Sequence, residues 1–418
     1  MSARPGDALR CDVLIVGGGA VGSALACALA ELPLDVVLVE ARETAKLEQP
    51  SFDGRTTALA NASQRILAAL GIWPELAPRA EPIRTVHVSE RGRFGAARIE
   101  AEHEGVEALG YTVENAVLGR ALWERLDRAP RLQVLAPATV AELRTDADAA
   151  EAHVEPGARV LRARLVVGAD GARSSVRAAL GVAAAEHDYE QRALIFNVTT
   201  EAPLAGRAFE RFTKRGALAF LPLTGSRAAV IWTLPSEDAE RALTLPTEEF
   251  RAQLQATFGF RLGRIARIGE RRAHSLARVA SEELTRERAL LIGDAALRLH
   301  PIAAQGFNLA LRDVATLAEV LADEIAAARE RGAEPDPGSA EVLERYRAWR
   351  AADRGRVSAF THGLVSLFGE STPGVGTVRG LGLVAFDLLP GAKALLARQT
   401  MGRGGRVPRL ARGLRLVE

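Results

Sequence analysis

The most constraining feature of the sequence is a glycine-rich stretch near its N-terminus. Asp12–Val16 is predicted to be a buried strand, GGGAVG at 17–22 a tight turn, and Ser23–Ala30 a helix. The next apolar stretch, Leu34–Val39, is predicted to be a second strand, and it is followed by Glu40. Short buried strands that alternate with helices are typical of a parallel sheet covered by helices. The chain is therefore predicted to be an α/β protein.

The same stretch predicts a dinucleotide site. Gly17, Gly19 and Gly22 satisfy the pattern G-x-G-x-x-G. Glycines let the backbone approach a pyrophosphate at a helix N-terminus, where its charge is favoured. An acidic side chain after the second strand, here Glu40, accepts hydrogen bonds from ribose hydroxyls. The pattern does not distinguish NAD from FAD.

The composition argues against several other classes of protein. The chain has 418 residues, 48% hydrophobic and 25% charged, which is ordinary for a globular protein of about two or three domains. A net charge of +2 gives no indication of nucleic-acid binding. Cys11 and Cys27 offer neither a disulfide framework nor a metal cluster, so no metal is expected. The uncharged stretch 13–30 is long enough to suggest a membrane span, but its clustered glycines favour a strand, turn and helix.

Two later apolar stretches end in short polar corners. Leu165–Ala169 is predicted to be a strand that leads into Asp170-Gly171, and Ala289–Ile292 is predicted to be a strand that leads into Gly293-Asp294. The chain then passes a proline and reaches Gly306, which is predicted to begin a helix. Either corner alone is a common turn. Their order after the first glycine pattern is far more specific.

With these three motifs, the sequence resembles the flavin-dependent aromatic hydroxylases of the para-hydroxybenzoate hydroxylase class. Within that class it is most similar to the ubiquinone-biosynthesis 2-octaprenyl-6-methoxyphenol hydroxylases. The similarity extends from about residue 11 to about residue 400. It is carried by FDGRTTALANASQRILAALGIW (52–73), TVHVSERGRFG (85–95), FERFTKRGALAFLPL (209–223) and HPIAAQGFNLALRDV (300–314).

The resemblance implies FAD as the bound cofactor. It assigns the first glycine pattern to the ADP part, the Asp-Gly corner to the region where FAD and the nicotinamide donor meet, and Asp294 to the ribityl chain. The helix N-terminus after the loop would stabilise negative charge on the reduced flavin. The implied cofactor-binding residues are Gly17, Gly19, Gly22, Glu40, Arg55, Arg120, Asp170, Gly171, Asp294, Gly306, Phe307 and Asn308.

The resemblance also implies the reaction. NAD(P)H, bound transiently, reduces the flavin; O2 adds to it as a C4a-hydroperoxide; and an electron-rich ring, here that of a polyprenylated phenol, takes up one oxygen atom. Pro301 is implied to form a wall at the flavin face. His300 is the candidate for proton transfer in the same loop, although a loop-shaping role explains it equally well, and the sequence identifies no firm general base.

The expected fold class is α/β, α+β overall, with a Rossmann-like FAD-binding domain interleaved with a β-sheet substrate domain and followed by C-terminal helices. Four β-rich stretches between 193 and 234 and a helix at Thr247–Phe258 are predicted to build the substrate domain. The expected segments are 10–82, 105–182 and 285–330 for FAD binding, 83–104 and 183–284 for the substrate sheet, 340–400 for the C-terminal helices and 401–418 for a basic tail.

The C-terminal region allows two interpretations. The favoured one is a docked helix at Leu381–Leu396 followed by a frayed tail. In the other, the apolar helix and the cationic tail contact an anionic membrane surface or an acidic partner. The tail arginines are Arg403, Arg406, Arg409, Arg412 and Arg415. The expected location is the cytoplasm, with peripheral contact at the inner face of the cytoplasmic membrane as an alternative.

The resemblance further implies partners in a ubiquinone-synthesis complex, whereas the oligomeric state is left open. Two other functions also remain open. One is a flavin hydroxylase of a small aromatic acid, which a buried arginine facing the substrate ring would favour. The other is a non-catalytic flavoprotein that serves as a scaffold in that complex.

Overall fold

The computed structural model describes residues 9–43, 56–300, 305–369 and 389–417. Its first layer is a sheet with the strand order β18-β19-β11-β1-β2-β8, in which β19, β11, β1, β2 and β8 are parallel neighbours. β1 lies at the centre, and an antiparallel ribbon, β9–β10, continues from β11. The bounds are β1 Leu9–Val16, β2 Val36–Val39, β8 Leu132–Leu135, β9 Thr139–Thr145, β10 Ala150–Glu155, β11 Arg159–Gly168, β18 Thr285–Arg286 and β19 Ala289–Leu291.

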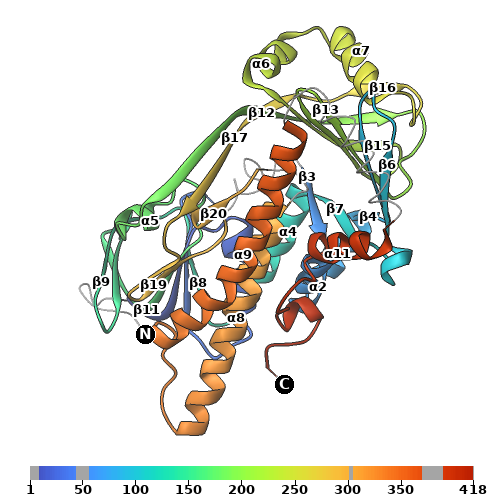
Figure 1. Ribbon diagram of the computed structural model, residues 1–418. Helices are drawn as coiled ribbons and strands as arrows, with labels where there is room; N and C mark the ends of the chain where they lie inside the picture. Colours follow the sequence, from blue (N-terminus) through green and yellow to red (C-terminus); the bar gives the residue numbers. More distant parts are fainter. Residues whose placement is uncertain (1–8, 44–55, 301–304, 370–388, 418) are drawn as a thin grey trace.

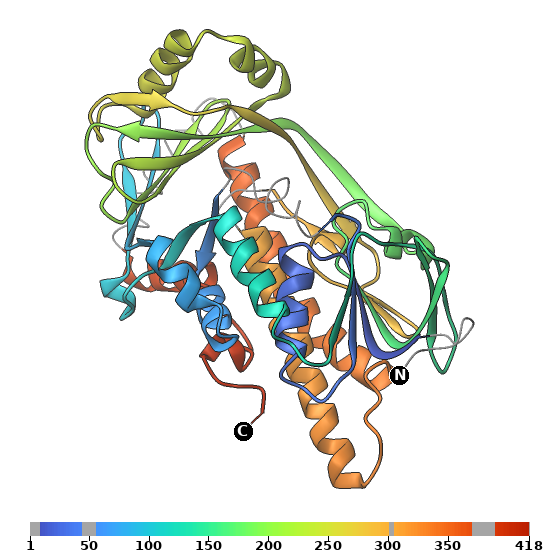
Figure 2. The same ribbon diagram turned by 180° about the vertical axis from the view of Figure 1, so that it is seen from behind.

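Helices cover one face of this sheet. Side chains of β1 on that face, such as Val13 and Ile15, are fully buried in the largest apolar cluster of the described residues. Figure 2 shows α1, α4 and α8 together beside the sheet, and the apolar contacts agree. The opposite face is covered by the β9–β10 ribbon and α5. The helix bounds are α1 Ala20–Leu29, α2 Asn61–Ala69, α3 Trp73–Leu76, α4 Asn115–Leu126, α5 Ser175–Ala179, α8 Gln305–Arg331 and α9 Ala340–Gly369.

The second layer is a nine-stranded sheet that lies above the first in Figure 1. Its order is β20-β17-β12-β15-β14-β13-β5-β6, and β16 pairs with β12. The β-rich stretches predicted from the sequence all form strands here, and the helix predicted at Thr247–Phe258 has those bounds. The strands are β5 Thr85–Glu90, β6 Ala96–Glu100, β12 Ala184–Thr200, β13 Arg207–Thr213, β14 Gly216–Pro222, β15 Arg227–Pro235, β16 Ile265–Ile268, β17 Arg272–Ser281 and β20 Leu297–Arg298.

The two faces of the nine-stranded sheet differ in burial. The upper face packs under α6 (Ser236–Thr244) and α7 (Thr247–Phe258), and its side chains are fully buried among phenylalanines such as Phe250 and Phe258. The lower face points toward the parallel sheet of the first layer and the upper end of α9 (Figure 1). Its side chains alternate with the buried ones and are partly accessible. A small sheet, β3-β7-β4, lies between the two layers, with bounds Thr56–Ala60, Gly110–Glu114 and Glu81–Ile83.

The C-terminal tail packs against the body of the protein. Helix α11 spans Pro390–Thr400. Beyond it, the Arg406 guanidinium lies 3.5 Å from the centre of the Trp349 ring, and Arg409 pairs with Glu319 and Asp323. The expectation of a frayed tail is therefore wrong, because the tail places apolar residues in the main core and Arg409 on two acidic partners. The apolar residues are Leu410, Ala411 and Leu416.

The apolar stretch near the N-terminus is part of the folded core. Residues 13–30 form the end of β1, the glycine turn and α1, as predicted. In the described parts of the chain, no helix is both long enough and apolar enough to cross a membrane.

Candidate active site

The carboxyl ends of the parallel strands bring the three motifs to one edge. β1 ends at Val16, β11 at Gly168 and β19 at Leu291. The glycine turn follows the first of these strands, the Asp-Gly corner the second, and the Gly-Asp corner the third. Ligands of open α/β sheets bind at such an edge. Stretches that are far apart in the sequence therefore form one candidate site.

Gly17 fixes the close approach of two of these motifs. Its φ of +104° lies where side chains are strongly disfavoured. A Cβ at this position would also lie 2.7 Å from the carbonyl oxygen of Ala169. At Gly22, a Cβ would collide with the carbonyl of Gly17. By contrast, a Cβ at Gly19 would meet no described atom within 4 Å, so this side of the turn is open toward a ligand.

Glu40 closes the glycine turn. Its Oε2 accepts a hydrogen bond from the Gly18 amide at 2.6 Å, and its Oε1 accepts one from the Arg42 amide at 3.0 Å. The side chain is 8% exposed. Each carboxylate oxygen can accept a further hydrogen bond, so ribose hydroxyls remain compatible with this position.

Asp170 and Arg177 join the second motif to the third. Asp170 Oδ2 accepts hydrogen bonds from Ser175, through its amide at 2.7 Å and its hydroxyl at 2.9 Å, and so caps α5. Its Oδ1 is buried with no partner among the described atoms. The Arg177 guanidinium donates to the carbonyl of Ala172 at 2.7 Å and to that of Ala295 at 2.9 Å. Arg177 therefore links the Asp-Gly corner to the Gly-Asp corner.

In the Gly-Asp corner, the backbone at Gly293 is tightly packed, whereas the side chain of Asp294 is accessible. Gly293 has a φ of +59°, and a Cβ there would lie 3.2 Å from Val21 in the first motif. The Asp294 side chain is accessible to solvent, yet burial by the protein around it raises its pKa. It has no hydrogen-bond partner among the described residues. A recessed carboxylate without a protein partner is suited to accept hydrogen bonds from ligand hydroxyls.

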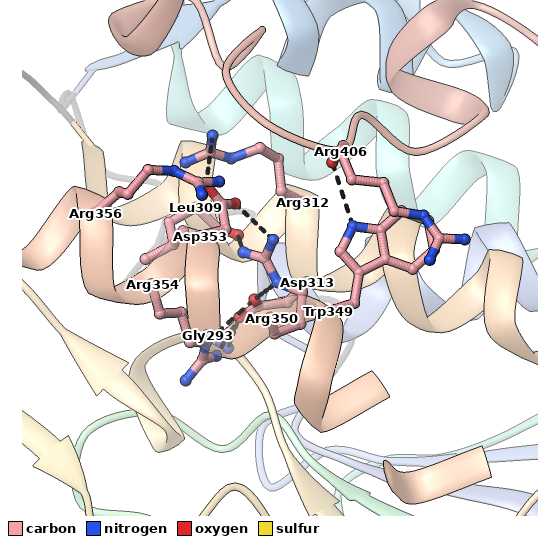
Figure 3. Close-up of polar contacts among 10 residues, drawn as sticks. All are labelled: Gly293, Leu309, Arg312, Asp313, Trp349, Arg350, Asp353, Arg354, Arg356 and Arg406. Atoms are coloured by element: carbon pink, nitrogen blue, oxygen red, sulfur yellow. Dashed lines mark hydrogen bonds and ion pairs between the residues drawn. The ribbon is translucent and has the colours of Figure 1, made fainter. Parts of the chain in front are cut away.

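A buried ionic cluster holds this corner from behind. Asp313 in α8 accepts a hydrogen bond from the Gly293 amide at 3.2 Å, and it pairs with Arg350 at 2.7 Å and with Arg354 of α9 (Figure 3). Burial alone would raise the pKa of Asp313, but the guanidiniums of Arg354 and Arg350 hold it below its usual value. Asp353 completes the cluster through a 2.6 Å contact with Arg350. Helix α9 is thus connected to the loop that carries Asp294.

The N-terminus of α8 lies at the same edge. The helix begins at Gln305, one residue before the predicted start, and a Cβ at Gly306 would meet no described atom within 4 Å. Phe307 packs partly against the main core. The Asn308 side chain donates to the carbonyl of Ala58 at 2.8 Å and accepts from the Ala60 amide at 2.7 Å. Asn308 thereby fixes β3 to α8. The N-terminus of a helix favours an anion placed next to it.

His300 is packed inside the protein. It is 3% exposed, its Nε2 lies 3.4 Å from Gln191 Oε1, and its ring contacts that of Tyr189. Burial lowers the pKa of His300 to about 4. Such an imidazole is neutral and weakly basic at neutral pH, which favours the loop-shaping role over proton transfer.

The structure gives fewer contacts for the remaining predicted site residues. Arg120 is exposed on α4 and makes no polar contact with another described residue. Gly171, with a φ of +84°, shapes the Asp-Gly corner and leaves open space beside it. Arg55 and Pro301 lie outside the described residues.

Sequence reasoning overlooked the residues that connect the motifs. Arg177, Asp313, Arg350 and Arg354 belong to no short pattern, and arginine is abundant throughout the chain. A signal existed in the spacing of Arg350 and Arg354, which places both side chains on one face of a helix. An acidic partner for that face could not be identified without knowing how α8 packs on α9.

The geometry fits FAD. Open space at Gly19, Gly171 and Gly306, the unpartnered Asp294 and the helix N-termini follow strands whose carboxyl ends form one edge. When bound, FAD would supply redox chemistry at its ring. Here Glu40 would hold the ribose, the Gly17–Gly22 turn the pyrophosphate and Asp294 the ribityl chain, with the α8 N-terminus next to the ring.

Comparisons with known proteins identify the family of this chain. Residues 10–351 match the family model described as FAD binding domain. Ubiquinone hydroxylase UbiL of Rhodospirillum rubrum is 40% identical, over 97% of this chain and 93% of that protein. The 3-demethoxyubiquinol 3-hydroxylase of Escherichia coli is 33% identical, over 90% and 94%.

Solved structures share the fold. The p-nitrophenol 4-monooxygenase PnpA of Pseudomonas putida has a TM-score of 0.76 at 20% identity, covering 96% of this chain and all of that one. The family match covers most of the chain, and the two hydroxylase relatives align over nearly all of it. The chain therefore belongs to the FAD-dependent monooxygenases, in the branch of the ubiquinone-biosynthesis hydroxylases.

Proposed function

We propose that this protein hydroxylates the ring of a polyprenylated phenol, of the 2-polyprenyl-6-methoxyphenol type, with NAD(P)H and O2 as co-substrates. The observation that carries this proposal is the lower face of the nine-stranded sheet, which lies opposite the candidate FAD edge. This face presents partly accessible aliphatic side chains, including Ile195, Leu221 and Ile231. Such a surface suits an apolar ring with a prenyl chain.

The composition of the lower face also bears on the alternative substrate, a small aromatic acid. A small aromatic acid needs a cation to hold its carboxylate, and arginine is the usual choice. Between β12 and β15 the residues on this face are Ala193, Ile195 and Asn197, paired with Thr233, Ile231 and Ala229. None of these six residues is charged. On the adjacent strand β17, Arg272 shares this face beside Ile195, and its guanidinium pairs with Glu270. The aliphatic composition supports a prenylated phenol over a carboxylated ring.

The overall reaction would be balanced as follows. NAD(P)H supplies a hydride and the medium a proton, one oxygen atom of O2 enters the ring, and the other leaves as water. The residues of this chain would bind and orient the cofactor, exclude water from the reacting atoms and hold the ring in reach. The substrate's ring position and prenyl length are not part of this proposal.

A test uses the FAD-loaded full-length protein, NAD(P)H, a short-chain 2-prenyl-6-methoxyphenol and isotopically heavy O2. Mass spectrometry should find one heavy oxygen atom in the ring. Asp294→Ala should abolish it together with FAD binding, whereas Glu282→Gln, an exposed change near β18, should retain it. NAD(P)H oxidation that yields only hydrogen peroxide would contradict the substrate, and a lack of NAD(P)H oxidation would favour the scaffold.

The family also supports a place for this chain beside other enzymes of ubiquinone synthesis, and a polyprenyl substrate supports peripheral contact with a membrane. The tail is a weak candidate for such a contact, because Arg406 and Arg409 already have partners within the protein. Flotation of the purified protein with anionic vesicles would test this contact. Recovery only in the unbound fraction, for the intact chain with FAD, would contradict it.

A further inference from the structure

Glu210 is a carboxylate on the lower face of the nine-stranded sheet. Glu210 lies in β13 between Phe209 and Arg211. Phe209 is buried under α7 with Phe258, so it occupies the upper face. Because successive side chains of a strand point to opposite faces, Glu210 occupies the lower face, opposite the candidate FAD edge.

Glu210 has aliphatic neighbours in the sheet. The strand register places it beside Ala219 of β14 and Val88 of β5. Its side chain is partly accessible and has no hydrogen-bond or ionic partner among the described residues. An ionised carboxylate in such a position is costly unless something satisfies it. A structural carboxylate would normally have a partner within the protein, so the missing partner points to a ligand.

The charged side chains around Glu210 do not account for its raised pKa. The nearest acidic side chains on neighbouring elements are Glu90, which lies beside Phe212 on β5, and Glu81 on β4, which packs against β14. Arg211 lies on the upper face, because it pairs with Leu218 in the core under α7, and its charged neighbours are Arg261 and Arg91. Burial is the cause that raises the pKa of Glu210, to about 7.

We propose that Glu210 is the catalytic base for the phenol: its carboxylate accepts the hydrogen bond of the substrate O–H group and then the proton. This proposal rests on the proposed function. The O–H bond of the phenol breaks, its electron pair stays on the phenolate oxygen, and a new O–H bond forms on Glu210. A phenolate ring is richer in electrons at its ortho and para carbons than a phenol ring, so it attacks oxygen more readily.

Each proton that is removed during one turnover has a destination. The hydrogen on the attacked carbon leaves as a proton when the ring regains its aromatic state. Glu210 then returns the first proton to the phenolate oxygen of the product. The base is suited to this exchange because a carboxyl with a pKa near the working pH both accepts and releases a proton easily. His300, with its pKa lowered to about 4, is a much weaker base.

The test compares Glu210→Gln, Glu210→Asp and the control Glu90→Gln as FAD-loaded full-length proteins. Hydroxylation of 2-prenyl-6-methoxyphenol is measured from about pH 6 to about pH 9. In the unaltered protein the rate should rise through about pH 7. Glu210→Gln should slow it by about 100-fold and move the rise to the pKa of the phenol itself, Glu210→Asp should recover part of the rate, and Glu90→Gln should keep the original profile.

A second readout does not depend on turnover. At about pH 8 the ultraviolet absorption band of the bound phenol should lie at the longer wavelength typical of an O–H group that donates a hydrogen bond to a carboxylate, with the unaltered protein and with Glu90→Gln, and should lose this shift with Glu210→Gln. FAD affinity should stay within about twofold in all variants, which shows that the cofactor edge is intact. If Glu210→Gln fails to fold, Glu210→Asp must still shift both the pH profile and the band.

The outcomes separate this inference from the proposed function. An unchanged pH profile and an unchanged absorption band in Glu210→Gln would overturn the role of Glu210 and leave the hydroxylase intact. An unaltered protein that binds the phenol with the shifted absorption band but never hydroxylates it would contradict the proposed function, while the role of Glu210 as acceptor of the phenol's hydrogen bond would stand.

Discussion

Two carboxylates show how differently one chemical group is used in this protein. Asp313, between α8 and α9, is 1% exposed and has two arginine partners and a backbone amide, so its pKa is lowered. Glu210, on the lower face of the nine-stranded sheet, has no described partner, and its pKa is raised to about 7. The first region fixes the backbone that receives the cofactor. The second leaves a titratable group free for chemistry.

The largest expected effect comes from removing the charge of the paired carboxylate. Asp313→Ala would leave Arg350 and Arg354 buried with an incomplete set of partners, which typically costs about 3–5 kcal/mol. Urea denaturation should show this loss of unfolding free energy. Asp336→Ala, which removes a partly exposed partner of Arg288, should cost about 1 kcal/mol or less. Equal losses of unfolding free energy in the two variants would show that the buried pairs of Asp313 stabilise the protein no more than the partly exposed pair of Asp336.

The unpaired carboxylate should make stability depend on pH with the opposite sign from an ordinary ion-paired acid. Between about pH 4.5 and pH 7 the folded state keeps the proton of Glu210 while the unfolded chain has lost it. Stability from this group therefore falls as the pH rises through that window. Relative to the unaltered protein, Glu210→Gln should gain about 2–3 kcal/mol between about pH 5 and pH 8. A constant difference across this range, measured by denaturation, would contradict the raised pKa.

Gly17, at the cofactor edge, should not tolerate a side chain. Gly17→Ala must adopt a φ of +104° beside Ala169, and strain of this kind costs about 1–3 kcal/mol. We expect FAD affinity, measured by flavin fluorescence, to fall about tenfold or more. Gly71→Ala, which has a φ of +72° but open space around it, is the control, and it should leave the affinity unchanged. Equal losses of affinity would show that Gly17 has no special role.

The smallest effect is expected in the C-terminal tail. Arg406→Ala removes a cation–π contact with Trp349 at an exposed site, worth about 0.5–1 kcal/mol. Thermal unfolding should detect a slight decrease relative to Arg415→Ala, whose side chain is exposed without a described partner. No difference between the two would indicate that the tail is held by its apolar residues alone.

The cofactor edge could be predicted because it is encoded in the backbone. Gly17, Gly22 and Gly293 are required by steric contact, and such positions leave short patterns in the sequence. The parallel strands around them follow from uninterrupted apolar stretches. The carboxyl ends of those strands meet at one edge whatever the surface residues are, so Glu40, Asp170 and Asp294 were placed in one region.

The rest depends on packing between distant elements. The role of Asp313 follows only from the contact of α8 with α9, and Glu210 is meaningful only because the register puts Phe209 under α7. The tail was predicted to fray because chain termini commonly do, whereas Glu319 and Asp323 of α8 form ion pairs with Arg409. A single sequence does not reveal which acid meets which base.

The most direct test of this account is an experimental structure of the protein with FAD and 2-prenyl-6-methoxyphenol bound. We predict the flavin ring at the N-terminus of α8, the ribityl chain at Asp294, and the phenol between the flavin and the lower face of the sheet with its oxygen within hydrogen-bond distance of Glu210. A phenol bound away from that face, or an FAD that does not contact Asp294, would contradict it.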